Sequence, residues 1–190
     1  MTYTMERTYK QGLLGYNLRL QYRWSVLANQ EGLFGFSTGK LRLLEDGTEK
    51  YAAVQHWSLR HFVSKLPVLN MFVASPYIVM SGGRKIGAIQ RPHGEYGLVG
   101  AINDILYEYR LHSHYTWSFT RDDRQIGIVK FEMGQHQYTV QVNEEGEENL
   151  DTLLLLCGCF DRESRSLYRY TIGTNYIPQD KYKERALWQP

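Results

Sequence analysis

Residues 77–89 have the sequence YIVMSGGRKIGAI, and residues 117–129 have the sequence WSFTRDDRQIGIV. The two segments align without a gap at an offset of 40 residues, which is 117 minus 77. Each pattern predicts a strand, a tight turn and a second strand that contains Ile-Gly, and a glycine inside a strand is typical of a bend or a close backbone approach. A weaker third copy at 24–35 has one more residue in its turn. The stretch therefore predicts a repeated, bent β-hairpin, unless unrelated hairpins resemble one another by chance.

Alternation of apolar and polar residues extends outward from these hairpins and predicts a mostly β chain. Residues that tolerate the positive φ angles of tight hairpins interrupt the alternation at 29–32, 45–47, 81–83, 121–123 and 143–146. Repeated bent hairpins suit a closed antiparallel β-barrel, which also removes exposed sheet edges. Because no Pro- or Ser-rich segment separates two halves, we expect one domain over 1–190, with 1–8 and 176–190 as peripheral tails.

The segment 149–162, NLDTLLLLCGCFDR, departs from the β pattern. Its consecutive leucines favour a helix, Asn149 is a good N-cap, and Asp151 places an acid in the first turn. Residues 153–160 contain no charged side chain, so the predicted helix at about 149–160 must be covered by protein on all sides. It is expected to pass through the inside of the barrel, and the alternating segment 166–172 then supplies a closing strand. Residues 57–73 fit either a short helix before Pro67 followed by a strand, or two strands bent at the proline.

Composition excludes several classes of protein. The net charge of the 190-residue chain is +2, which is too small for nucleic-acid binding without a dense basic cluster, and no such cluster is present. We find no motif for a nucleotide, a metal cage or an acyl-transfer triad. The polar N-terminus does not resemble a signal peptide, and no apolar run approaches the roughly 20 residues of a spanning helix. We therefore expect a cytoplasmic protein, soluble or peripheral to a membrane.

The cysteines and histidines are weak candidates for chemistry. Cys157 and Cys159 lie within the apolar run, where a disulfide between them would be strained, so we expect reduced, buried and unreactive thiols. His112 and His114 would lie on one face of a strand, a spacing that some metal sites use. Neither has an evident third ligand beside it, so two exposed histidines on a polar strand face is the simpler interpretation.

Paired carboxylates occur at Asp122-Asp123 and Glu144-Glu145. Both pairs fall in predicted hairpin turns, where acids are common because they bond their own backbone. A general acid and base would instead have to meet in a cleft, so these pairs do not indicate catalysis.

Basic side chains recur near the two aligned hairpins, and a closed barrel could bring these hairpins side by side. A shared patch of this kind would attract phosphate headgroups. The alternative is an ordinary solvated face that keeps the protein soluble. The candidate residues are Arg84, Lys85, Arg91, Arg121, Arg124 and Lys130.

Several of these features occur together in one known group of proteins. The hairpin sequence GRKIGAIQR at 83–91, the acid-led hydrophobic helix at 151–160, Asp161 and Arg162, and a last strand resemble the tubby C-terminal-like superfamily. That group includes the LURP-one-related proteins and the phospholipid scramblases. The resemblance covers roughly 9–172 and implies a barrel of about twelve strands around one central helix. The proline-rich segment, cysteine cluster and C-terminal membrane helix of scramblases have no counterpart here, so scrambling is not expected.

The resemblance implies a non-enzymatic binding or regulatory module that recognises anionic lipid headgroups or a protein partner. We expect no cofactor, no metal and no nucleic acid, and the oligomeric state stays open. One alternative is a structural or protein-interaction domain without a small ligand. Another is an enzyme that uses a cavity beside the central helix.

Overall fold

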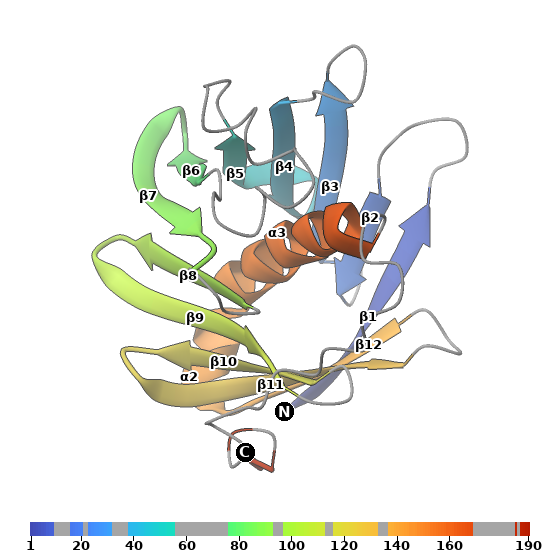
Figure 1. Ribbon diagram of the computed structural model, residues 1–190, viewed down its shortest axis with the longest axis vertical. Helices are drawn as coiled ribbons and strands as arrows, with labels where there is room; N and C mark the ends of the chain where they lie inside the picture. Colours follow the sequence, from blue (N-terminus) through green and yellow to red (C-terminus); the bar gives the residue numbers. More distant parts are fainter. Residues whose placement is uncertain are drawn as a thin grey trace.

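In the part of the chain that the structure describes, antiparallel strands predominate, and the helices α2 and α3 accompany them (Figure 1). The computed structural model describes residues 1–9, 16–20, 23–31, 38–55, 76–92, 97–112, 116–132, 137–168, 185 and 187–190. The segment 57–73, expected to be helix or strand, lies outside these ranges. The strands are β1 (Thr2–Tyr9), β2 (Tyr16–Leu20), β3 (Trp24–Glu31), β4 (Thr38–Glu45), β5 (Thr48–Gln55), β6 (Tyr77–Ser81), β7 (Arg84–Gln90), β8 (Gly97–Ile102), β9 (Ile105–Leu111), β10 (Thr116–Arg121), β11 (Arg124–Glu132) and β12 (Gln137–Val142).

All the described strands belong to one sheet, and the prediction of a mostly β chain is confirmed. Strands that follow one another along the chain pair antiparallel, and β1 pairs with both β2 and β12. Residues 1–8 are therefore not a peripheral tail, because residues 2–9 form β1 and bury Tyr3 and Met5. Because β1 forms backbone hydrogen bonds with strands on both of its sides, residues 2–9 are an integral part of the sheet.

Four of the fully described hairpin turns lie at one end of the sheet, which we call the turn end. They are formed by Asp46-Gly47, Gly82-Gly83, Asn103-Asp104 and Asp122-Asp123, and each of these residues has a positive φ. Positive φ at both central residues is the geometry that joins twisted strands through two residues. The turns predicted at 45–47, 81–83 and 121–123 are thus confirmed, whereas the turn at 103–104 was not predicted.

The aligned hairpins share their geometry as well as their sequence. Val79 lies opposite Gly87, and Phe119 lies opposite Gly127, with a register irregularity immediately after Val79 and Phe119. A Cβ on Gly87 would overlap the Ala101 carbonyl oxygen, so the glycine allows the close approach of β8.

Two predicted turns are wrong. β3 continues through Glu31, so 29–31 are strand and the third hairpin copy at 24–35 does not turn there. The segment 143–146 is not a hairpin turn but the start of helix α2 (Glu144–Glu148), because the Asn143 side chain accepts a hydrogen bond from the Gly146 amide at 2.8 Å and caps the helix.

The predicted hydrophobic helix is present as α3 (Leu150–Tyr168), and it is longer than expected. Residues 166–168 are helical rather than the start of a closing strand. The segment 161–166 contains three residues that favour a helix, Arg162, Glu163 and Arg165, and it has no proline or glycine to end one. Asn149 does not cap α3 with its side chain; its amide nitrogen bonds the Glu145 carbonyl, and its oxygen accepts from the Tyr107 hydroxyl at 2.7 Å.

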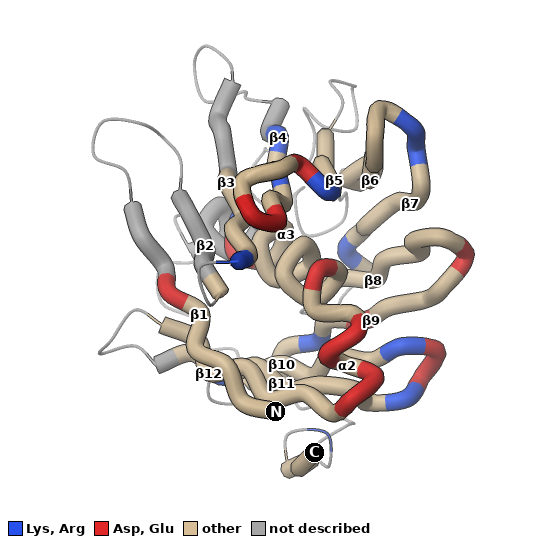
Figure 2. Tube along the Cα trace, turned by 180° about the vertical axis from the view of Figure 1, so that it is seen from behind, with Lys and Arg blue, Asp and Glu red and all other residues tan. Residues whose placement is uncertain are grey.

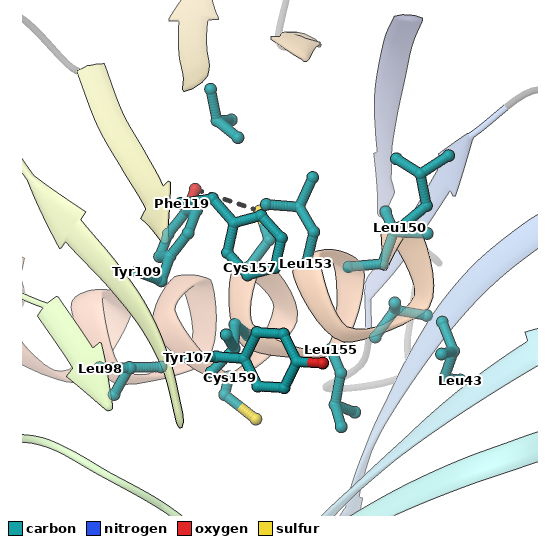
Figure 3. Packing of buried hydrophobic residues seen from close by; sticks show 14 of the residues in the cluster. Leu43, Leu98, Tyr107, Tyr109, Phe119, Leu150, Leu153, Leu155, Cys157 and Cys159 are labelled. Carbon is teal, nitrogen blue, oxygen red and sulfur yellow. Dashed lines mark hydrogen bonds between the residues drawn. The ribbon is translucent and has the colours of Figure 1, made fainter. Parts of the chain in front are cut away.

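Helix α3 contributes many residues to the buried core. Every residue from 150 to 159 is buried, and α3 contacts β3, β4 and β5 as well as β8 and β9 (Figure 1). Phe160 also packs edge-on against Tyr109 and Trp117. Figure 3 shows leucine and cysteine side chains of the helix among aromatic side chains of the strands. The absence of a polar stripe at 153–160 is explained by these contacts on several sides.

Candidate functional site

The six candidate basic residues do not lie together. Four flank turns at the turn end, and two lie at the opposite ends of their strands. The β6–β7 turn is followed by Arg84 and Lys85, and the β10–β11 turn is flanked by Arg121 and Arg124. At the other end of the sheet, Arg91 follows the last residue of β7, and Lys130 pairs with Thr116, the first residue of β10.

The two basic hairpin tips are separated by a third hairpin. β8 and β9 lie between β7 and β10 in the sheet, and their turn contains Asp104 (Figure 2). Arg121 is moreover bound to Glu145 of α2, with 3.3 Å between Nη1 and Oε1. By contrast, Arg84 and Lys85 are exposed on a turn of two glycines. The sequence therefore predicted a larger basic patch than the topology assembles.

A polar pocket opens at the same end of the sheet, where α2 meets α3. Its volume is about 270 Å³. The side chains come from β1, β2, β3, the β4–β5 hairpin and the two helices, which are far apart in the sequence. The lining residues are Tyr3, Leu20, Arg23, Trp24, Glu45, Lys50, Glu147, Glu148, Leu150 and Asp151. No local sequence signal marks this set, and we did not predict it.

Ion pairs connect the cations of the pocket to two of its acids. Lys50 Nζ lies 3.0 Å from Asp151 Oδ2 and 3.4 Å from Glu45 Oε2. Arg23 Nε donates to Glu45 Oε1 at 3.0 Å, and this bond contributes most to lowering the pKa of Glu45. Burial would lower the pKa of Lys50, but the hydrogen bond and the charge of Asp151, with Glu45, outweigh burial and raise it.

Aromatic rings complete the wall of the pocket. Lys50 Nζ lies 4.8 Å from the centre of the Trp24 ring, and Arg23 Cζ lies 5.5 Å from it. Both distances are within the range of cation–π attraction. Burial is the main cause of the raised pKa values of two tyrosines here. Burial, and then Asp151, raise the pKa of Tyr51, next to the pocket, to about 12, while burial and a 2.7 Å hydrogen bond to Glu147 raise the pKa of Tyr3 in its lining.

The histidine and cysteine candidates lie elsewhere. His112 is buried rather than exposed, and its Nε2 lies 2.8 Å from Ser118 Oγ, so the interpretation of an exposed polar face is wrong for this residue. His114 lies outside the described residues. Cys157 and Cys159 are buried free thiols, as expected, and the Tyr109 hydroxyl bonds Cys157 Sγ at 3.5 Å (Figure 3). Within the described ranges, no three His, Cys, Asp or Glu side chains are grouped as metal ligands.

Comparison with known proteins adds no assignment. The chain matches no family model, no curated protein and no solved structure. Among the described helices, none is both long and apolar enough to cross a membrane.

Proposed function

We propose that the chain is a non-enzymatic binding module of the tubby-like type, with a closed barrel around a central helix. Two observations support this architecture: β1 pairs with both β2 and β12, and α3 is buried between strands that are far apart in the sheet order. Since leucine side chains of α3 fill the space between these strands, ligands bind at the ends or on the outer face of the barrel.

The ligand surface in this proposal is the tip of the β6–β7 hairpin, and its ligand is an anionic phospholipid headgroup. The observation that carries the proposal is that Arg84 and Lys85 are exposed next to Gly82-Gly83, and neither forms an ion pair with a described residue. The other three described two-residue turns contain an aspartate. This tip therefore offers positive charge without an acid in its own turn.

The expected affinity is modest. Each basic residue near an anionic membrane contributes about 1 kcal/mol, so Arg84 and Lys85 together contribute about 2 kcal/mol, roughly a 30-fold effect on the binding constant. Arg124 lies on the next basic tip and adds long-range attraction at low ionic strength. Because anionic lipids are concentrated in the cytoplasmic leaflet, the proposal places the protein at that surface.

Vesicle co-sedimentation tests the proposal. Phosphatidylcholine vesicles with phosphatidylserine should bind the wild type at low salt, and vesicles without phosphatidylserine should not. The double variant Arg84→Ser/Lys85→Ser should lose most of this binding. The matched control, Arg91→Ser/Lys130→Ser, removes the same charge at the far ends of β7 and β11 and should bind nearly as the wild type does.

Two results would overturn the proposal. Equal loss in both double variants would show that net charge, rather than the β6–β7 tip, governs association. No association of the wild type at about 0.01 M salt, where the Debye length is roughly 30 Å, would direct the search to a protein-interaction module.

A further inference from the structure

We propose that Arg185 is a reversible latch, which ties its own segment to the outer face of β9, β10 and β11 and occupies a binding site for an arginine-containing segment of a partner protein. Arg185 lies against β9 and β11, near the C-terminus marked in Figure 1. Because Arg84 and Lys85 belong to a different hairpin, this proposal does not depend on lipid binding at the β6–β7 tip.

The latch contacts three side chains that form a row across the sheet. Thr120 on β10 lies opposite Glu108 on β9 and opposite Gln125 on β11. Their neighbours Tyr107 and Phe119 stack on each other in the core. Since successive side chains of a strand point to opposite faces, Glu108, Thr120 and Gln125 face outwards, and we call them the outer row.

Arg185 contacts both ends of the outer row. Its Nη1 lies 3.1 Å from Glu108 Oε2, and Gln125 Nε2 donates to the Arg185 carbonyl oxygen at 2.8 Å. The side chains of Arg185 and Glu108 are each only 16% exposed, so their ion pair is less screened by salt than a surface pair. The row thus recognises the guanidinium and the backbone carbonyl of one residue, with Thr120 between the two contacts.

The outer row is positioned without help from Arg185. The other carboxylate oxygen of Glu108, Oε1, lies 3.3 Å from Arg110 Nη2. Gln125 Nε2 also donates to the Gly127 carbonyl at 3.3 Å. When Arg185 leaves, these contacts continue to orient the acceptor and the donor, and a preorganised site of this kind favours a second arginine in the same place.

Arg185 leaves one group of the row unused. Thr120 is fully buried, yet its hydroxyl has no hydrogen-bond partner among the described residues. A buried hydroxyl without a partner costs free energy, which weakens the closed latch. Because a guanidinium group has five N–H donors, an arginine seated closer to Thr120 would bond the hydroxyl as well as the carboxylate. The unused hydroxyl therefore favours a partner segment that fits the row better than Arg185 does.

Trypsin cleavage after Arg185 measures the opening of the latch, because the protease must bind the same guanidinium. Release of the fragment 186–190 should be at least about tenfold faster in Glu108→Gln, which loses a charge-assisted bond. It should be about threefold slower in Thr120→Val, which removes the unpartnered hydroxyl and keeps the shape of the side chain. The matched control Asp123→Asn removes a carboxylate from the exposed β10–β11 turn and should be cleaved as the wild type is.

A second cleavage site separates latch opening from global unfolding. Arg42 lies on β4, which pairs on both sides with other strands, so cleavage after Arg42 requires unfolding and should be equally slow in all variants. Equal acceleration after Arg42 and Arg185 in Glu108→Gln, or no acceleration after Arg185, would overturn the latch.

A peptide added in trans tests the binding site. Fluorescein-labelled Lys-Glu-Arg-Ala-Leu-Trp, the sequence of 183–188, should bind Arg185→Ala at least about tenfold more tightly than the wild type, in which the latch competes. The control Arg124→Ala removes the same charge from an exposed position and should bind as the wild type does. The peptide with citrulline in place of arginine should bind none of these proteins.

Three results of the peptide experiment would overturn the proposal. Equal affinity of Arg185→Ala and the wild type would show that Arg185 does not occupy the site. Absence of binding to Arg185→Ala, or equal binding of the citrulline peptide, would show that the row does not recognise arginine. Binding of free L-arginine as tightly as the peptide would assign the site to a small molecule and overturn the partner-protein assignment.

Discussion

Replacing Gly158 by alanine tests how closely α3 packs against the sheet. A Cβ on Gly158 would lie 2.8 Å from Val26 Cγ1, which is too close for two carbon atoms, and 3.9 Å from Leu41 Cδ2, which is ordinary contact. Val26 on β3 is fully buried, so it has little room to move away. The glycine thus allows the helix to lie directly on β3 at this point.

Two opposing terms determine the expected effect. Gly→Ala inside a helix gains about 1 kcal/mol of stability from backbone propensity, whereas overpacking in a core costs typically about 1–3 kcal/mol. We therefore expect Gly158→Ala to be neutral or to destabilise by up to about 2 kcal/mol. Val26→Ala alone should destabilise by about 2 kcal/mol, from the lost methyl groups and the cavity they leave.

The double variant Gly158→Ala/Val26→Ala gives the decisive measurement. The methyl group added at position 158 would enter the space left by the valine side chain, so the two changes should couple favourably by at least about 1 kcal/mol in urea unfolding followed by circular dichroism. Val140, equally buried but on β12 and not among the nearest neighbours of the Gly158 position, provides the control, and Gly158→Ala/Val140→Ala should be additive. A single Gly158→Ala variant that gains the full propensity term, or additivity with Val26→Ala, would refute the packing of α3 on β3.

Three more predictions concern burial and titration. Leu155→Asp should abolish soluble expression, because an unpaired charge would replace a fully buried side chain. The control Leu106→Asp, at an exposed position of β9, should remain soluble. Equal soluble expression of the two variants would contradict the burial of Leu155 in α3. Cys157 and Cys159 should react with a thiol reagent only after denaturant is added, and rapid native labelling would show that they are accessible. With its pKa raised to about 12, Tyr51 keeps its proton in the folded state after the unfolded chain has lost it near pH 10. The contribution of the Tyr51 hydroxyl to the free energy of unfolding should be present below about pH 10 and decline towards pH 12. Tyr51→Phe should weaken this loss of stability and remove one late-titrating tyrosine from an absorbance titration. An unchanged absorbance titration would contradict the raised pKa of Tyr51.

Local sequence determined the features that depend on a few neighbouring residues. The Gly82-Gly83 and Asp122-Asp123 turns were predictable because these residues accept positive φ angles, which a two-residue hairpin requires. The offset of 40 residues correctly predicted that Gly87 and Gly127 occupy equivalent positions. The uninterrupted apolar run at 153–160 likewise predicted a buried helix, and every residue from 150 to 159 is buried in α3.

Competition between local signals explains the errors. Asn143 can begin a turn or cap a helix, and a single sequence does not show which partner its side chain finds; here it is the Gly146 amide. The charged and polar residues after Phe160 fit a helix terminus or its continuation equally well, and the chain continues as helix to Tyr168. His112 has a polar side chain but is buried, because Ser118 on the neighbouring strand provides a hydrogen-bond partner.

Tertiary structure alone decided the candidate sites. Strand order places the β8–β9 hairpin between the two basic tips, so residues that are equivalent in the repeat are not neighbours in space. It also brings Tyr3, Trp24, Lys50, Glu147 and Asp151 around one pocket, although they come from opposite ends of the described chain. The physical reason is that alternation and turn propensity act over a few residues, whereas charge compensation and cavity shape depend on which distant strands the sheet makes adjacent.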